Sequence, residues 1–205
     1  NKYKLQLKYT NADKSIKIDY PFQLDEDCAS LLGLMPDGSL IKDLRRIYFY
    51  QSKDVRKLEL FEKLIKRKFS PSSTLLRKKQ NDESYINSQT LARFFYHVMD
   101  LPKSDESMRV PSWIFLSPKT VKIAYLREAF AMEGTILKRL YEIRFITKDE
   151  LFAFDIKKLL LQLDITSTIN TRIGGTHRTI QYRLSIYRTE NFRKFEEIGF
   201  TLPMH

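Results

Sequence analysis

Two carboxylates stand at equivalent places in two similar segments of this chain. Asp37 and Glu133 each end an apolar stretch with helical spacing, and each is followed by a glycine, Gly38 or Gly134, and a small hydroxyl residue. Two helices that each deliver one carboxylate at the C-terminal tip can build a shared metal site. Negative charge at that end of a helix is disfavoured by up to about 1 kcal/mol, and a bound cation relieves this cost. Either segment alone is more simply a turn after a helix, so the pair carries the metal hypothesis.

The elements around the two acids repeat in the same order. The acids lie 96 residues apart (133 − 37), and each is followed by two strand-like stretches, an amphipathic helix, two more strands and a helix that closes on Leu-Pro. Helices are predicted from Asp25 or Asp27 to about Met35 and over 53–69, 88–99, 119–132, 149–163 and 190–198. Strands are predicted over 3–9, 15–20, 39–42, 46–51, 74–79, 83–87, 135–139, 141–147, 167–173 and 179–187.

This repeat predicts a pseudo-dimer within one chain. The expected units are an N-terminal β-hairpin extension at 1–24, a first half at 25–102, a polar linker at 103–118 and a second half at 119–205. Two copies are too few for a solenoid, which needs at least about three. A two-fold pair that imitates a symmetric homodimer is the expected arrangement.

Composition narrows the partners and the setting. Lys and Arg number 36 against 25 acids, a net charge of +11, which favours a polyanion, nucleic acid first and an anionic membrane surface second. An ordinary basic protein would show the same balance. Cys28 is the single cysteine, so a disulfide or multi-cysteine zinc site is excluded and a reducing cytoplasm or organellar matrix is expected. There is no apolar run of about 18 residues that could span a membrane.

The second acidic segment and the C-terminal segment resemble those of a known family. Residues 125–135 read YLREAFAMEGT and residues 190–200 read ENFRKFEEIGF. The first of these is similar to the motif of the LAGLIDADG homing endonucleases: an aromatic residue, Leu-Arg, a helix rich in small residues, an acid, Gly and Ser or Thr. The resemblance covers about residues 25–205. The first motif departs from the pattern, because Gly33 lies one residue closer to Asp37 and Pro36 directly precedes the acid.

The resemblance implies an α+β fold of two pseudo-two-fold-related αββαββα halves whose antiparallel sheets form a DNA-binding saddle. It implies a monomeric, site-specific double-strand DNA endonuclease with a long asymmetric target. Asp37 and Glu133, beside Gly38 and Gly134, would hold Mg²⁺ or Mn²⁺, a hard cation that suits carboxylate oxygens. Lys53 and Lys148, at the starts of equivalent helices, are candidate catalytic residues that stabilise charge on the scissile phosphates; helix-start surface lysines are the simpler interpretation.

The strands would carry DNA recognition. In 179–187, Ile180, Tyr182, Leu184 and Ile186 are expected to pack under helices, while the alternate polar side chains can enter a major groove. Each basic residue could equally be an ordinary solvated charge. The candidate DNA contacts are Lys42, Arg46, Tyr48, Tyr50, Arg77, Lys79, Lys138, Arg144, Arg172, Arg178, Gln181 and Arg183.

Other hypotheses stay open at this point. A non-cleaving member of the fold could act as a DNA-binding regulator or as an intron-RNA maturase, and Pro36 beside the first acid favours this alternative. A plain α+β interaction module with an incidental repeat is a third. No protein-splicing residues frame the chain, so we expect a freestanding or intron-encoded protein, although a trimmed chain could hide the flanks of an intein.

Overall fold

The computed structural model describes residues 18, 22–51, 54–69, 75–78, 83–174 and 179–200. The predicted N-terminal hairpin at 1–24 lies almost entirely outside the described residues. In the described part of the chain, no helix is both long and apolar enough to cross a membrane.

The first half forms a four-stranded antiparallel sheet backed by helices. Its elements are α1 (Glu26–Gly33), the 3-10 turn η2 (Met35–Asp37), β1 (Gly38–Leu40), β2 (Arg46–Tyr50), α2 (Val55–Phe69), β3 (Leu75–Lys78), β4 (Glu83–Asn87) and α3 (Gln89–His97). The strand order is β1-β2-β4-β3, and every neighbouring pair is antiparallel.

The second half repeats this arrangement. Its elements are α5 (Lys119–Glu133), β5 (Gly134–Leu137), the 3-10 turn η3 (Lys138–Leu140), β6 (Glu142–Thr147), α6 (Glu150–Leu161), β7 (Thr168–Gly174), β8 (Thr179–Ile186) and α7 (Thr189–Ile198). The order β5-β6-β8-β7 is the counterpart of the first sheet. The expected αββαββα order is therefore confirmed in both halves.

The segment between the halves is packed against both of them. It contains a short helix, α4 (Ser112–Leu116). The Ser104 N–H donates to the Leu40 carbonyl at 2.8 Å, and Arg109 Nη2 donates to Asp155 Oδ1 at 3.0 Å. Residues 103–118 thus bridge the first sheet and α6.

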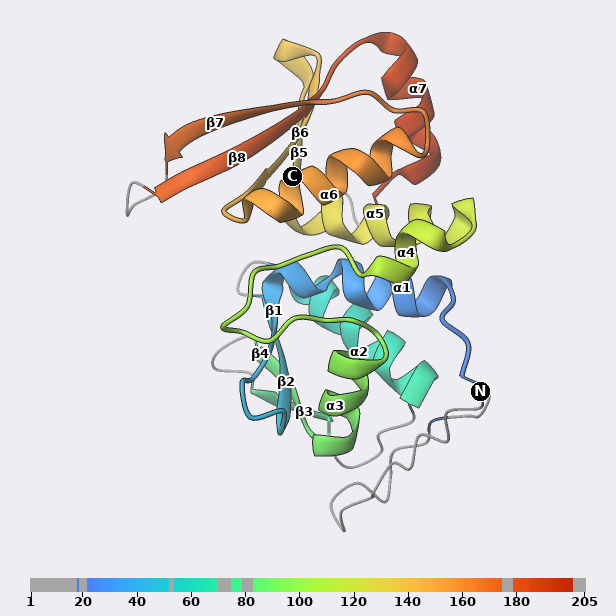
Figure 1. The fold of residues 1–205 in the computed structure, drawn as a ribbon, viewed down its shortest axis with the longest axis vertical. Coiled ribbons are helices and arrows are strands. Elements are labelled where there is room, and N and C mark those ends of the chain that lie inside the picture. The colour runs from blue at the N-terminus through green and yellow to red at the C-terminus, as the bar shows by residue number, and fades with distance from the viewer. Residues whose placement is uncertain are drawn as a thin grey trace.

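Helices α1 and α5 lie side by side in the middle of the molecule, with one sheet on either side of the pair (Figure 1). Helices α2 and α3 cover one face of the first sheet, and α5 and α6 cover the matching face of the second. The opposite face of each sheet is called its open face below. A single cluster of buried apolar side chains runs through both halves.

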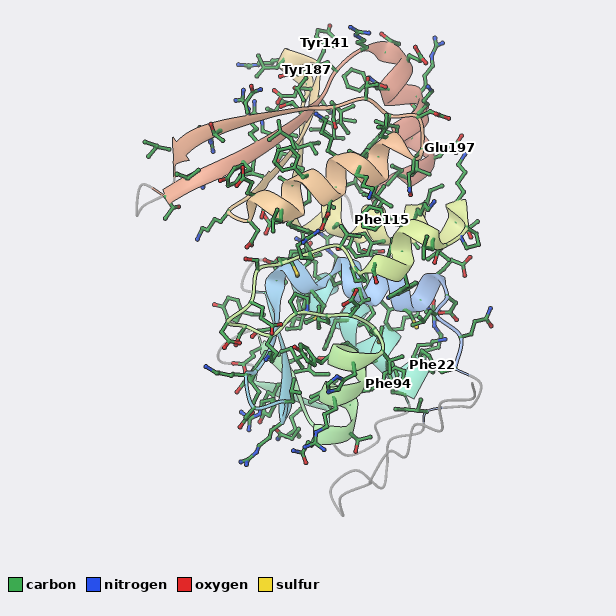
Figure 2. All side chains as sticks on the ribbon, in the orientation of Figure 1. Phe22, Phe94, Phe115, Tyr141, Tyr187 and Glu197 are labelled. Atoms are coloured by element: carbon green, nitrogen blue, oxygen red, sulfur yellow. The ribbon has the colours of Figure 1, made fainter. Side chains whose placement is uncertain are left out.

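The predicted helix starts follow local chemistry. Asp25 caps α1 by accepting from the Cys28 N–H at 3.1 Å, and Ser88 caps α3 by accepting from the Leu91 N–H at 3.0 Å. At the N-terminal edge of the described chain, Phe22 meets the ring of Phe94 edge to face, with centroids 4.7 Å apart (Figure 2). This contact attaches the segment before α1 to α3.

The prediction for strand 179–187 is wrong in its first part. Leu184 and Ile186 are buried under the helices as expected. Ile180, however, is 57% exposed, and its cross-strand partner Ile173 is 67% exposed. The ribbon of β7 and β8 runs past the end of α6 (Figure 1), so no helix covers its outer part. The alternation predicted the face correctly but could not reveal where the helices end.

Candidate functional site

The two motif helices approach each other closely because one residue has no side chain. A Cβ at Gly33 would collide with the Tyr125 carbonyl of α5 and would lie 2.9 Å from Cβ of Glu128. Ala129 lies opposite and is fully buried. Gly33 and Ala129 are the small residues that permit this contact. Glu128 is also buried here.

Each helix tip turns directly into the first strand of its sheet. Gly38 and Gly134 have φ of −111° and −92°, so neither uses the left-handed conformation. Their requirement is steric: a Cβ at Gly134 would collide with the Phe130 carbonyl, and one at Gly38 would collide with the Met35 side chain. Close approach to the preceding turn is thus what favours glycine at both tips.

The acid pair, Asp37 and Glu133, meets where the tips converge. Both side chains are partly buried. Burial raises the pKa of Asp37, against the opposing charge of Lys57 and a hydrogen bond from Gln51. Burial, followed by repulsion from Asp37, raises the pKa of Glu133 to about 7, against the charges of Lys57 and Lys148. Burial is thus the main cause of both shifts, and the charge of Asp37 adds to the shift of Glu133.

This donor set fits a hard divalent cation. Within the described residues, no group of three or more Asp, Glu, His or Cys side chains gathers at one point. The protein would thus supply two carboxylates, and the other ligands would be water or substrate oxygens. Mg²⁺ commonly binds in this way, because it retains several waters.

Two residues beside the acid pair were missed in the sequence. Gln51 Nε2 donates a hydrogen bond to Asp37 Oδ2, and it lies 4.0 Å from Sδ of Met132 on α5. Lys57, in the first turns of α2, acts on both carboxylates. Gln51 directly follows β2, in a segment whose repeat counterpart is 143–147, and this equivalence was an available signal. No such signal marked Lys57, because its counterpart in the repeat is the buried Phe152.

Of the two predicted catalytic lysines, Lys148 lies near Glu133, and its charge counteracts the rise in that pKa. Lys53 lies outside the described residues. A cleft of about 370 Å³ opens beside Glu133, lined in part by Lys148, Asp149 and Gln181. Pro36 and Gly38, the neighbours of Asp37, line the same cleft.

The open face of the first sheet gathers three of the predicted DNA contacts. Arg46, Tyr48 and Tyr50 alternate with the buried Ile47 and Phe49, so all three lie on this face. By register, β4 adds Glu83, Tyr85 and Asn87 beside them. These three residues are not among the predicted DNA contacts, although the alternation in 83–87 carries the signal for their shared face.

The open face of the second sheet carries Arg144, Gln181, Arg183 and Arg172. Arg172 Nε donates to Gln181 Oε1 across the strands at 3.1 Å. Arg144 forms a two-point ion pair with Glu142, which lowers the pKa of that carboxyl. The Nε of Arg183 is buried and has no hydrogen-bond partner in the described structure.

The remaining predicted contacts are scattered. Lys42 forms an ion pair with Asp105 at 3.1 Å, and Lys138 is exposed in η3 rather than in a strand. Arg77 pairs in register with Ser84, whose side chain is buried on the face that the helices cover. The register position of Arg77 therefore does not belong to the row of Arg46 and Tyr48 on the open face. Lys79 and Arg178 lie outside the described residues.

Comparison with known proteins agrees with this architecture. The LAGLIDADG-like domain family matches residues 120–199. The structure of the homing endonuclease I-DmoI in complex with DNA and Mn has a TM-score of 0.60 at 19% identity, over 87% of this chain and 98% of that one. Full-length WhiA from Thermatoga maritima has a TM-score of 0.56 at 18% identity, over 86% of this chain and 56% of that one.

Curated relatives match only in part. A segment of one subunit of the DNA gyrase from Mycobacterium leprae is 41% identical over 95 residues, and one of the probable translation initiation factor IF-2 from Methanocaldococcus jannaschii is 26% identical over 102 residues. These segments are 7% and 9% of the respective proteins. The family match and the shared fold confirm the resemblance: residues 120–199 form a LAGLIDADG-like domain, and the chain as a whole has the LAGLIDADG fold.

Proposed function

We propose that this protein is a metal-dependent, site-specific endonuclease that cuts both strands of a DNA duplex, that is, a homing endonuclease. The observation that carries the proposal is the acid pair: two partly buried carboxylates stand at the tips of two packed elements, and the charge of Asp37 acts on Glu133. The antiparallel sheets on either side present basic and aromatic side chains on their open faces. The fold shared with I-DmoI, whose structures include DNA, supports a duplex as the substrate.

The residues of the site have different roles, which follow from their positions. Asp37 and Glu133 would hold Mg²⁺ or Mn²⁺, which when bound supplies an acidified water and charge stabilisation at the scissile phosphates. Gln51 orients the Asp37 carboxylate through its hydrogen bond. Lys57 and Lys148 supply positive charge beside the acids, where a phosphate would otherwise be repelled.

Recognition is assigned to the open faces. The single chain supplies both halves, which favours a monomer. The two faces carry different side chains, which favours a target without two-fold symmetry. An intron-encoded origin and a cytoplasmic or organellar location stay predictions from the sequence.

The second candidate is a non-cleaving member of the fold that binds DNA or intron RNA. It is favoured by the atypical first tip, in which Pro36 lies in a 3-10 turn instead of an α-helix. Against it, Gly38 pairs with Phe49 just as Gly134 pairs with Phe145, so both tips enter their sheets in the same register. This equivalent register supports a catalytic role for Asp37 despite the atypical turn.

The test is cleavage of a random duplex library in Mg²⁺, read by sequencing the new ends. We expect Asp37→Asn and Glu133→Gln to lower cleavage about 10³-fold or more while binding in Ca²⁺ is retained, as for loss of a group that acts mainly in the transition state. Glu59→Gln, on the exposed side of α2, is the matched control and should cut normally. Normal cutting by both acid variants would refute the assignment. Tight binding without cutting in any divalent metal would favour the second candidate.

A further inference from the structure

The far ends of the two central strands carry opposite charges at matching positions. Ile47 pairs with Ile86 in the first sheet, and Ile143 pairs with Ile186 in the second. The residues just before them, Arg46 and Glu142, therefore occupy equivalent places on the two open faces. The pseudo-symmetry relates a cation to an anion here.

The Arg46 guanidinium is anchored by its neighbours through only part of its N–H groups. Its Nε donates to Asn87 Oδ1 and its Nη1 donates to the Tyr48 hydroxyl. The guanidinium also lies over two rings, 4.9 Å from the centroid of Tyr85 and 5.3 Å from that of Tyr48. A guanidinium has five N–H donors, so these two hydrogen bonds leave about three unused. The side chain is partly exposed, so those donors can reach a ligand on the open face.

Glu142 is closed off by its own neighbours. Its residue is only 3% exposed, and its two oxygens accept from Nε and Nη2 of Arg144 at 2.9 and 2.7 Å. Ser185 Oγ donates to the same carboxylate at 2.5 Å. The Arg144 side chain is only 15% exposed. This cluster is neutral and largely buried although it lies on the open face, whereas the Arg46 cluster has a net positive charge and is partly exposed.

We propose that Arg46 determines sequence specificity by reading a guanine in the major groove, and that the equivalent Glu142–Arg144 pair reads no base in the other half-site. The proposal rests on the DNA binding proposed above. Arginine pairs with O6 and N7 of guanine through two parallel hydrogen bonds, a contact that needs a well-oriented guanidinium. The two tyrosine rings and Asn87 provide that orientation before DNA binds.

The location of the guanine follows from the strand. Arg46 precedes Gln51, which contacts Asp37, by five residues, or about 16 Å of strand. B-DNA advances about 3.4 Å per base pair, so a strand that follows the groove places this guanine about five base pairs from the centre of the target. A phosphate contact at the same place would instead weaken binding to all sequences equally.

The experiment is selection of bound duplexes from a random library in Ca²⁺, with wild type, Arg46→Lys and Tyr48→Phe in parallel. Wild type should enrich a site with guanine at one such position in one half only. Arg46→Lys keeps the charge but loses the planar fork, so the preference for guanine there should fall about 10-fold or more while other positions stay unchanged. Tyr48→Phe removes one anchor and should weaken the same preference less.

The outcomes separate the two proposals. If wild type enriches no sequence, the proposed DNA function fails, and this inference fails with it. If wild type enriches a site whose guanine preference persists in Arg46→Lys, or if that variant binds every sequence more weakly by the same factor, only the inference is overturned. Melting temperatures of all three proteins, which should agree within a few degrees, show that each variant is folded.

Discussion

The two motif helices end differently and yet deliver their acids to the same place. The second runs as one α-helix to Glu133, whereas the first stops at Gly33 and completes its path with the 3-10 turn at Met35–Asp37. Pro36 lacks an N–H and cannot sit in a helix interior, but it is tolerated in the first turn of a tighter helix. The strand register after each tip is the same, so sheet pairing rather than helix type fixes where each tip enters its sheet.

The surroundings of the two acids differ more than their positions. Asp37 is hydrogen-bonded by Gln51, while Glu133 borders the open cleft with Lys148. The sheets differ in reach as well, because β7 and β8 have 7 and 8 residues against 4 and 5 in β3 and β4. Among the described residues, the second half therefore has the longer ribbon.

The largest effect on stability should come from a substitution on α1 that disturbs its contact with α5. Gly33→Ala places a methyl group against backbone atoms of α5, and such overpacking costs about 2–3 kcal/mol. The counterpart Ala129→Gly makes no clash and should cost only about 1–2 kcal/mol, from helix propensity and a lost methyl group. Urea unfolding of both variants measures the difference. Equal losses would mean that the helices do not depend on close approach at Gly33.

The next effect is a pH dependence of stability that should differ between the two acids. In metal-free protein the pKa of Glu133 is raised from 4.5 to about 7, so the native state holds the proton more tightly than the unfolded state. The Glu133 carboxyl therefore makes the free energy of unfolding fall as the pH rises from about 4.5 to about 7, and its contribution is constant above pH 7. Glu133→Gln lacks this fall and should be about 2–3 kcal/mol more stable than wild type at pH 8, with little difference at pH 4.

Denaturant titrations at pH 4, 6 and 8 in EDTA measure that difference, and adding Mg²⁺ to wild type should remove part of it. Asp37→Asn, whose pKa shift is in the same direction but is partly offset by Gln51 and Lys57, is the matched variant and should gain less. A gain that is the same at all three pH values would contradict the assigned cause.

The smallest effect concerns the lysines. Lys57 acts on both carboxylates and Lys148 on Glu133 alone. Lys57→Met should therefore lower the rate of cleavage about 10-fold and Lys148→Met about 3-fold, within the range expected for partly solvated charges. Single-turnover cleavage of the selected duplex measures both. If Lys148→Met has the larger effect, the shared role of Lys57 is wrong.

Much of the fold was readable from the chain because its signals are local. Caps such as Asp25 and Ser88, the apolar spacing of α2 and the alternation in 83–87 each depend on a few neighbouring residues. The pairing of Arg144 with Glu142 was also readable, since residues two apart in a strand share a face. Lys57 was not, because nothing in α2 itself indicates which other helix tips it approaches.

The sequence by itself determined the duplication, the order of elements in each half and the equivalent positions of the two acids in the repeat, because periodicity and spacing are properties of the chain alone. Tertiary structure decided how those acids behave. The approach of α1 to α5 at Gly33, the burial that raises the pKa of Glu133 and the reach of Gln51 and Lys57 arise only when distant segments pack. The same holds for the opposite charges of Arg46 and Glu142, whose equivalence exists only in the register of the two sheets.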